Sequence, residues 1–416
     1  MAERADKLKE EVAEMIASSA FSGQRERLHL IDTLERLCLD HLFEEEINAA
    51  LPQIEAAGAS DCDLGTVALW FCLLRKHRYR VSPDVFARFK NEEGGFLADN
   101  PEDLLSLYDA AHMRMQGETI LDEAILFTRR RLETVLRNME ESSLARETKS
   151  ALEIPLPRRV RIYDSKHYIS AYEKDATVHE TVLQLAKLNS NIMQLHYQHD
   201  LQIITRSMTI LDDIYDSYAT PEECEILTKC IEKTEDLVRS FNKEVKMLQD
   251  GYIPKSVEEH LQVSIRTGGC PILSCASFIG MNDIATKNCF DWVSRIPNMV
   301  QALSRILRLL DDLQSYEREQ LIPHVASTID SYMKEHNVSI EVAREKIHTL
   351  KEESWKDFND EWLNPNNTYP KKVLERLFNL TRTMEFMYNQ DDNFTNCSNL
   401  KDTIYLLFVE PFAELI

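Results

Sequence analysis

Apolar side chains recur along this chain at the three- or four-residue spacing of helices. Between residues 28 and 51 they occupy Leu30, Ile31, Leu34, Leu37, Leu42 and Ile47. No long stretch alternates apolar and polar residues as a half-buried strand would. Only 10 glycines and 13 prolines interrupt the 416 residues, so the segments between them are long enough for helices. The pattern predicts an all-α fold.

Two prolines mark the best candidate for a linker. Pro155 and Pro157 lie in the stretch EIPLPRRVRIYDSK, and a proline removes a backbone donor and clashes with the preceding turn of a helix. No helix is therefore expected to cross this point. We expect two helical domains, residues 1–160 and residues 161–416.

Three aspartates, Asp212, Asp213 and Asp216, interrupt the apolar stretch SMTILDDIYDSY. On a helix Asp212 and Asp216 project from one face about one turn apart, where like charges repel. A solvated acidic face is the usual meaning of such a cluster, and a DDxxD string arises by chance in roughly one sequence of this acidity in ten. The apolar neighbours on both sides instead suggest a pocket wall, where a hard divalent cation such as Mg²⁺ would neutralise the carboxylates.

A second acidic run strengthens the metal interpretation. In RLLDDLQSYEREQ, Asp311, Ser315 and Glu319 are four residues apart, so a helix would align two carboxylates and a hydroxyl on one face. Arg308 lies one turn earlier on that face and is suited to gripping an anion. Two such faces across an apolar bundle suit a hydrophobic substrate with a diphosphate head, bridged to the acidic walls by several magnesium ions.

Charge and cysteine content narrow the classes of partner and the compartment. The chain has 70 acidic and 48 basic residues and a net charge of −22, which disfavours binding to nucleic acid and to anionic membranes. Nine scattered cysteines without a C-x-x-C pair favour a reducing compartment. The sequence has no run of 18 apolar residues, and its first residues lack signal- or transit-peptide character. We expect a cytoplasmic protein.

The two acidic motifs resemble those of plant class I terpene synthases, most closely the sesquiterpene cyclases. ILDDIYDSY and LLDDLQSYERE match the family's DDxxD and (N/D)DxxSxxxE motifs in the family's order. Further resemblance runs through LIDTLERL, LLSLYDAAHMR, ISAYEKD, GYIPKSVEEHL, ESWKDFNDEWL and LKDTIYLLFVEPF. The resemblance implies a non-catalytic, capping N-terminal domain, a metal-binding C-terminal domain, and a monomer that cyclises farnesyl diphosphate and releases diphosphate.

The resemblance also implies roles for the residues of both motifs. Asp212 and Asp216 would bind two magnesium ions, with Asp213 as a less direct neighbour. The third ion would be held by Asp311, Ser315 and Glu319, and Mn²⁺ is a possible substitute for Mg²⁺. Arg308 would contact the diphosphate. The sequence does not indicate the terpene product.

Further positions that match the family are open to simpler explanations. Thr267, Gly268 and Gly269 fall where the family has a helix break that turns carbonyls towards a carbocation, although two glycines also suit an ordinary helix interruption. Tyr388 matches a pocket tyrosine, yet a tyrosine on an amphipathic helix is as often a core residue. Asp392 and Phe394, a few residues further on, fall in the family's capping loop.

Compared with the family, the chain has shortfalls on both sides of the first motif. LHYQHDLQIITR runs directly into SMTILDDIYD, where the family has an aromatic-rich segment and an R-D-R element. ILTKCIEKTED passes directly to LVRSFNKEVKMLQDGYIP, where the family has further helices. We therefore expect a terpene synthase fold with missing helices. The alternative is a catalytically impaired or inactive helical protein that retains metal or diphosphate binding.

Overall fold

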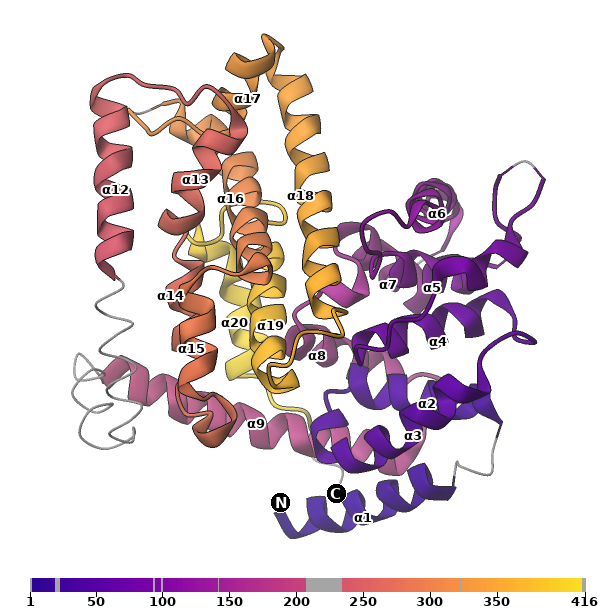
Figure 1. Cartoon of the computed structure of the whole chain (residues 1–416). Helices are drawn as coiled ribbons and strands as arrows, with labels where there is room; N and C mark the ends of the chain where they lie inside the picture. The colour runs from indigo at the N-terminus through magenta and orange to yellow at the C-terminus, as the bar shows by residue number, and fades with distance from the viewer. Residues whose placement is uncertain are drawn as a thin grey trace. The chain divides into compact units, whose positions relative to one another are not determined.

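The computed structural model is helical throughout the part of the chain that it describes, which comprises residues 2–18, 23–92, 94–98, 100–140, 142–206, 234–321 and 323–413. Within these ranges the only extended pairing is an isolated bridge between Lys90 and Phe96. The expected all-α fold is confirmed (Figure 1). No helix in these ranges has the length and apolar character needed to cross a membrane. The first acidic motif, with Asp212, Asp213 and Asp216, lies outside the described residues.

The chain divides into two compact units, one formed by Met1–Thr205 with Ser398–Ile416 and the other by Arg206–Cys397. Between the helices that end at Glu153 and begin at Arg161, Leu156–Arg158 form a short 3-10 helix. No α-helix therefore crosses Pro155 and Pro157, as their chemistry requires. The compact units divide between Thr205 and Arg206. The domain boundary near residue 160 remains a prediction.

The first unit holds ten of the described α-helices. They are α1 (Ala2–Ser18), α2 (Gln24–Arg36), α3 (Glu44–Ala57), α4 (Leu64–Lys76), α5 (Pro101–Ala111), α6 (Thr119–Asn138), α7 (Ser143–Glu153), α8 (Arg161–Tyr172), α9 (Glu180–Arg206) and α20 (Lys401–Phe408). The most buried of these is α4, which packs against α2 and α5. Asp63 fixes its start by accepting a hydrogen bond from the backbone N–H of Thr66 at 2.8 Å.

The C-terminal segment is attached to α9 by a row of amide side chains. Asn191 donates to the carbonyl of Phe412 at 2.9 Å and accepts from its N–H at 2.8 Å. Gln194 donates to the carbonyls of Leu407 and Glu410, each at 3.1 Å. Because these side chains satisfy backbone groups that no regular structure pairs, they order the segment after α20.

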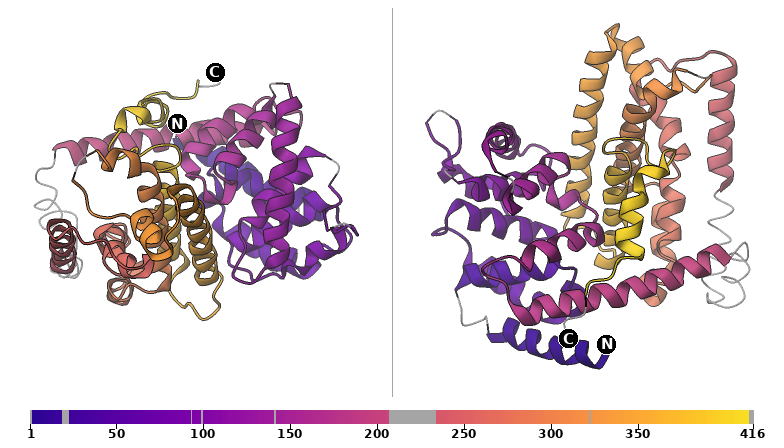
Figure 2. Two further views of the ribbon diagram at one scale, coloured as in Figure 1. Left: turned by 90° about the horizontal axis from the view of Figure 1, so that it is seen from above. Right: turned by 180° about the vertical axis from the view of Figure 1, so that it is seen from behind.

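The second unit is built around α16 (Asn298–Glu319). The other α-helices that the structure describes in this unit are α12 (Thr234–Gln249), α13 (Val257–Thr267), α14 (Cys270–Ala276), α15 (Lys287–Ser294), α17 (Thr328–His336), α18 (Ile340–Trp362) and α19 (Lys371–Met387). Helix α16 packs against α13, α14, α17, α18 and α19, and Figure 2 shows it among them from two further directions. Helix α12 lies at the edge of the unit beside α13.

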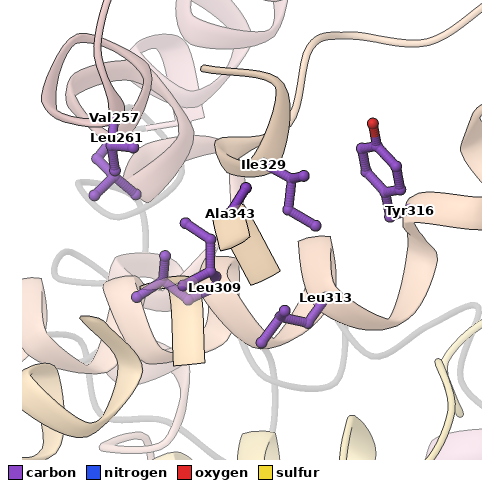
Figure 3. Close-up of a cluster of buried hydrophobic side chains, with 8 residues drawn as sticks. Val257, Leu261, Leu309, Leu313, Tyr316, Ile329 and Ala343 are labelled. Atoms are coloured by element: carbon purple, nitrogen blue, oxygen red, sulfur yellow. The ribbon is translucent and has the colours of Figure 1, made fainter. Parts of the chain in front are cut away.

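Apolar residues from four helices, α13, α16, α17 and α18, meet along one side of α16 (Figure 3). Leu309 and Leu313 of α16 are fully or almost fully buried, as are Ile329 of α17 and Ala343 of α18. Leu261 completes the contact from α13. At roughly 25 cal/mol for each Å² of apolar surface removed from water, this packing fixes the position and rotation of α16. The rotation in turn determines where the polar face of α16 points.

Candidate active site

The four polar residues that the sequence singled out in the second motif all lie on α16. Arg308, Asp311, Ser315 and Glu319 follow one another at three- or four-residue spacing within this single uninterrupted helix. The apolar residues between them are buried on the other sides of the helix. The spacing therefore gives one polar face, which is the geometry that the motif required.

Arg308 sits between the two carboxylates of the acid pair. Its Nη1 atom lies 2.8 Å from Oδ2 of Asp311 and 3.6 Å from Oδ1 of Asp312. Burial opposes the charge of the guanidinium, but Asp312 and Asp311 raise its pKa above the ordinary arginine value. The Arg308 side chain remains a cation at any physiological pH.

The carboxylates of this face are poorly neutralised in the absence of a cation. Burial raises the pKa of Asp311 to about 7; Arg308 opposes the shift, and the negative charges of Asp312, Glu319 and Asp392 add to it. Burial, followed by the charge of Asp312, also raises the pKa of Glu319. Both shifts have the sign expected where buried carboxylates lie near other negative charges.

Ser315 contributes a hydroxyl that the fold does not use. Its side chain is fully buried, and its Oγ atom has no hydrogen-bond partner of normal geometry in the described part of the chain. Ser315 nevertheless lies close enough to Glu319 to favour the charged form of that carboxylate. A buried hydroxyl without a partner is costly. Two carboxylates and this oxygen fit a hard divalent cation. In the described ranges, no group of three or more His, Cys, Asp and Glu side chains is placed to hold a metal, so a complete metal centre requires further ligands.

Asp312, which the sequence reasoning did not single out, is committed to the fold. Its carboxylate is almost completely buried and accepts a hydrogen bond at 2.6 Å from the backbone N–H of Thr328, the first residue of α17. His260 of α13 lies close by, with Nε2 3.7 Å from Oδ2 of Asp312. A carboxylate at a helix N-terminus is stabilised by the helix dipole. Asp312 therefore joins α16 to α17.

Tyr388 lies directly after α19 and faces Asp311. Burial and the nearby charges of Asp311 and Asp392 raise the pKa of the Tyr388 hydroxyl. The Tyr388 ring packs on Phe394, with the ring centroids 5.5 Å apart. The residue is buried, as a core tyrosine would be, but its hydroxyl belongs to the polar cluster.

The loop after Tyr388 is tied back to α16. Asp392 accepts hydrogen bonds from the backbone N–H groups of Phe394 and Thr395, each at 3.1 Å, and pairs with Nη2 of Arg318 at 2.7 Å. These contacts hold the loop beside the C-terminal turns of α16. Its role in capping a site remains a prediction.

The chain breaks its helix at Thr267, Gly268 and Gly269, between α13 and α14. Gly269 has a φ of 72°, a conformation that favours glycine. A Cβ atom at Gly268 would lie 2.8 Å from Cδ2 of Leu307, so the absence of a side chain allows α13 to approach α16 closely. The expected interruption is present, and the part that its carbonyls play remains a prediction.

Glu244 of α12 is a candidate that sequence reasoning missed. Its Oε1 atom accepts a hydrogen bond from Oγ1 of Thr267 at 2.7 Å. Burial raises its pKa, while Thr267 and then Arg308 favour its charged form. Glu244 belongs to no local acidic motif and reaches this cluster only because α12 packs on α13, so no sequence signal marks it.

Comparison with known proteins covers both units. Residues 1–152 match the family model for the terpene synthase N-terminal domain, and residues 232–357 match the model for the terpene synthase family metal binding domain. An alpha-terpineol synthase, described as chloroplastic, from Zea mays is 46% identical over 509 residues, covering 99% of this chain and 81% of the relative. A beta-sesquiphellandrene synthase from Sorghum bicolor is 37% identical, covering 99% of this chain and 91% of the relative.

Solved structures give the same picture of the fold. Isoprene synthase from grey poplar (Populus x canescens), in complex with three Mg²⁺ ions and dimethylallyl-S-thiolodiphosphate, superposes with a TM-score of 0.85 at 25% identity and covers 99% of this chain and 97% of its own. A limonene synthase with 2-fluorolinalyl diphosphate superposes with a TM-score of 0.82 at 24% identity, which supports the fold alone.

The alignment to the maize relative also supports the expectation of missing segments. It extends over 509 residues, whereas this chain has 416, so at least 93 residues of the relative, the difference between the two, have no counterpart here. The alignment nevertheless covers 99% of this chain. The chain therefore belongs to the terpene synthase family, whose members are lyases that act on prenyl diphosphates.

Proposed function

We propose that this chain is a magnesium-dependent sesquiterpene synthase, which ionises and cyclises farnesyl diphosphate and releases diphosphate. The observation that carries the proposal is the polar face of α16, where Asp311, the unpartnered hydroxyl of Ser315 and Glu319 follow Arg308. This face lies within the segment that matches the family's metal binding domain. The match to a beta-sesquiphellandrene synthase supports a fifteen-carbon product.

In this proposal the metal ligands come from both acidic motifs. Asp212 and Asp216, outside the described residues, would hold two magnesium ions, and Asp311, Ser315 and Glu319 a third; Mn²⁺ could take the place of Mg²⁺. The metal ions would supply positive charge that stabilises the departing diphosphate.

The remaining site residues would bind the head group and shape the pocket. Arg308 would donate hydrogen bonds to the diphosphate, because a guanidinium is suited to paired contacts with phosphate oxygens. Tyr388 would lie at the pocket wall. Thr267 and Gly268, at the helix break, would present backbone carbonyls to the carbocation. A water-excluded pocket strengthens each of these electrostatic contacts.

The length of the substrate is the least constrained part of the proposal. The 46% identical relative is named for α-terpineol, a ten-carbon alcohol, and more distant relatives for the fifteen-carbon β-farnesene and zingiberene. The purified chain should therefore be incubated with Mg²⁺ and farnesyl, geranyl or geranylgeranyl diphosphate, and its volatile products identified by mass spectrometry. A cyclic fifteen-carbon product is expected from farnesyl diphosphate. Turnover of geranyl diphosphate alone would overturn the substrate assignment.

A second candidate function follows from the residues that are missing. At least 93 residues of the maize relative have no counterpart in this chain, and a bundle that loses wall helices can lose its pocket. The alternative is an inactive terpene synthase-like protein that still binds metal and diphosphate. A well-folded sample that forms no product, but melts at a higher temperature with Mg²⁺ and diphosphate, would favour this alternative.

Compartment and assembly are part of the same proposal. We place the protein in the cytoplasm as a monomer, on the basis of its cysteine usage and of the family resemblance. The maize relative is described as chloroplastic. A fluorescent fusion of the full chain, imaged in plant cells, would decide between the two compartments, and light scattering after size-exclusion chromatography would measure the mass.

A further inference from the structure

Arg308 lies directly beside Asp311, one of the candidate metal ligands. Its Nη1 atom lies 2.8 Å from Oδ2 of Asp311, and both side chains are 19% exposed. Its Nε atom is buried and has no hydrogen-bond partner in the described part of the chain. The guanidinium therefore has donor capacity that its carboxylate neighbours do not use.

The two carboxylates beside Arg308 are held to different degrees. Asp312 is 3% exposed and is fixed by the hydrogen bond from the backbone N–H of Thr328, while its other oxygen lies 3.6 Å from Arg308. Asp311 instead accepts a hydrogen bond from Arg308, a side chain of the candidate site itself. Asp311 can therefore exchange its partners without unfolding a helix terminus, whereas Asp312 cannot.

We propose that the Arg308–Asp311 ion pair is a clasp that a divalent cation and a diphosphate open together. The cation takes the carboxylate of Asp311, the diphosphate takes the guanidinium of Arg308, and Asp312 keeps Arg308 in place during the exchange. The proposal rests on the metal site of the proposed function and adds a coupling between its two ligands.

The energetic basis of the coupling is the burial of both partners. A cation that binds Asp311 alone leaves a buried guanidinium with one carboxylate fewer, and an anion that binds Arg308 alone leaves a buried carboxylate without its cation. Either uncompensated charge is costly in a partly buried site. Binding of the cation removes the cost that opposes binding of the diphosphate, and binding of the diphosphate removes the cost that opposes binding of the cation. Such coupling is reciprocal by thermodynamic linkage.

Calorimetric titration of the full chain with MnCl₂, without any diphosphate, tests the cation side. Replacing Arg308 by Gln should tighten Mn²⁺ binding about fivefold or more, because Asp311 is released. Arg308→Lys keeps a cation and should change the affinity much less. Arg305→Gln removes the same charge one turn earlier on α16, where no ion pair with Asp311 exists, and serves as the matched control. In an Asp311→Asn background, Arg308→Gln should give no gain.

Titration with inorganic pyrophosphate in EDTA tests the reciprocal side. Asp311→Asn should tighten pyrophosphate binding by a similar factor, and the gain should vanish when Arg308 is also replaced by Gln. The clasp is wrong if Arg308→Gln, folded by circular dichroism, binds Mn²⁺ no more tightly than the wild type, or if its gain persists without Asp311. Neither titration uses a prenyl diphosphate, so an intact clasp with no terpene product would overturn the proposed function alone.

Discussion

Glu35 is a buried carboxylate that pairs with two side chains of the first unit, Lys76 and His77. It accepts a hydrogen bond from Lys76 Nζ at 2.6 Å and lies 2.6 Å from His77 Nε2. Burial opposes its charge, but Lys76 and His77 lower its pKa well below the ordinary value of 4.5. The cluster joins α2 to the end of α4.

Replacing Glu35 by Gln should lower the free energy of unfolding by about 3–5 kcal/mol, because Lys76 would be left as a buried charge without its main partner. Urea unfolding followed by circular dichroism would measure the loss at pH 7. Because the folded pKa is depressed, this stabilisation is complete above the unfolded pKa and is lost as the pH falls below about 4.5. Glu45→Gln, at an exposed position on α3, should change stability by less than about 0.5 kcal/mol; an equal loss in both variants would contradict the prediction.

Asp109 of α5 should have the opposite pH dependence. Burial raises its pKa from 3.8 to about 6; Arg159 and the hydrogen bond from the Leu156 N–H oppose the shift. The folded state therefore binds the proton more tightly than the unfolded state, and this residue adds stability as the pH falls from 6 to 4, by up to about 1.4 kcal/mol per pH unit. Comparing wild type with Asp109→Asn across this range isolates the contribution. Parallel stability curves for the two proteins would refute it.

At the scale of the helix, the row of amide side chains on α9 holds the C-terminal segment in a fixed conformation. Asn191→Ala would remove the partners of both backbone groups of Phe412 and should cost about 1–3 kcal/mol locally. Hydrogen exchange measured by mass spectrometry should become faster in residues 407–412 and stay unchanged in α4. Ser190→Ala, one residue earlier on α9, is the control. Unchanged exchange in the segment after Asn191→Ala would show that other contacts order it.

Helix α16 also shows how much of the candidate site the sequence predicts. The spacing of Asp311, Ser315 and Glu319 was sufficient to predict one polar helical face, because helical geometry is local. The anchoring of Asp312 by Thr328 depends on how α17 packs, and Glu244 reaches Thr267 only through the contact of α12 with α13. Such approaches between distant segments follow from tertiary packing, which periodicity alone does not determine.

At the scale of the whole molecule, the sequence predicted the helical class, since long segments with few glycines and prolines leave no other regular structure. The limits of the compact units were not predicted, because the C-terminal segment returns to the first unit through contacts with α8 and α9. Helix α12 exposes an apolar stripe of Val238, Phe241, Val245 and Leu248, between 36% and 54% exposed, next to the face that packs on α13.

The exposed stripe on α12 predicts an unusual tolerance of polar substitutions. Replacing Phe241 and Val245 by Gln should change the free energy of unfolding by less than about 0.5 kcal/mol each, because each side chain is already about half exposed. Leu261→Ala, at a buried position on α13, should cost about 2–5 kcal/mol through the lost burial and the cavity. The double Gln variant should also bind less of a hydrophobic dye. If Phe241→Gln destabilised the chain as much as Leu261→Ala, the stripe would be packed in solution, and the loss of the relatives' helices would have been compensated by repacking around α12.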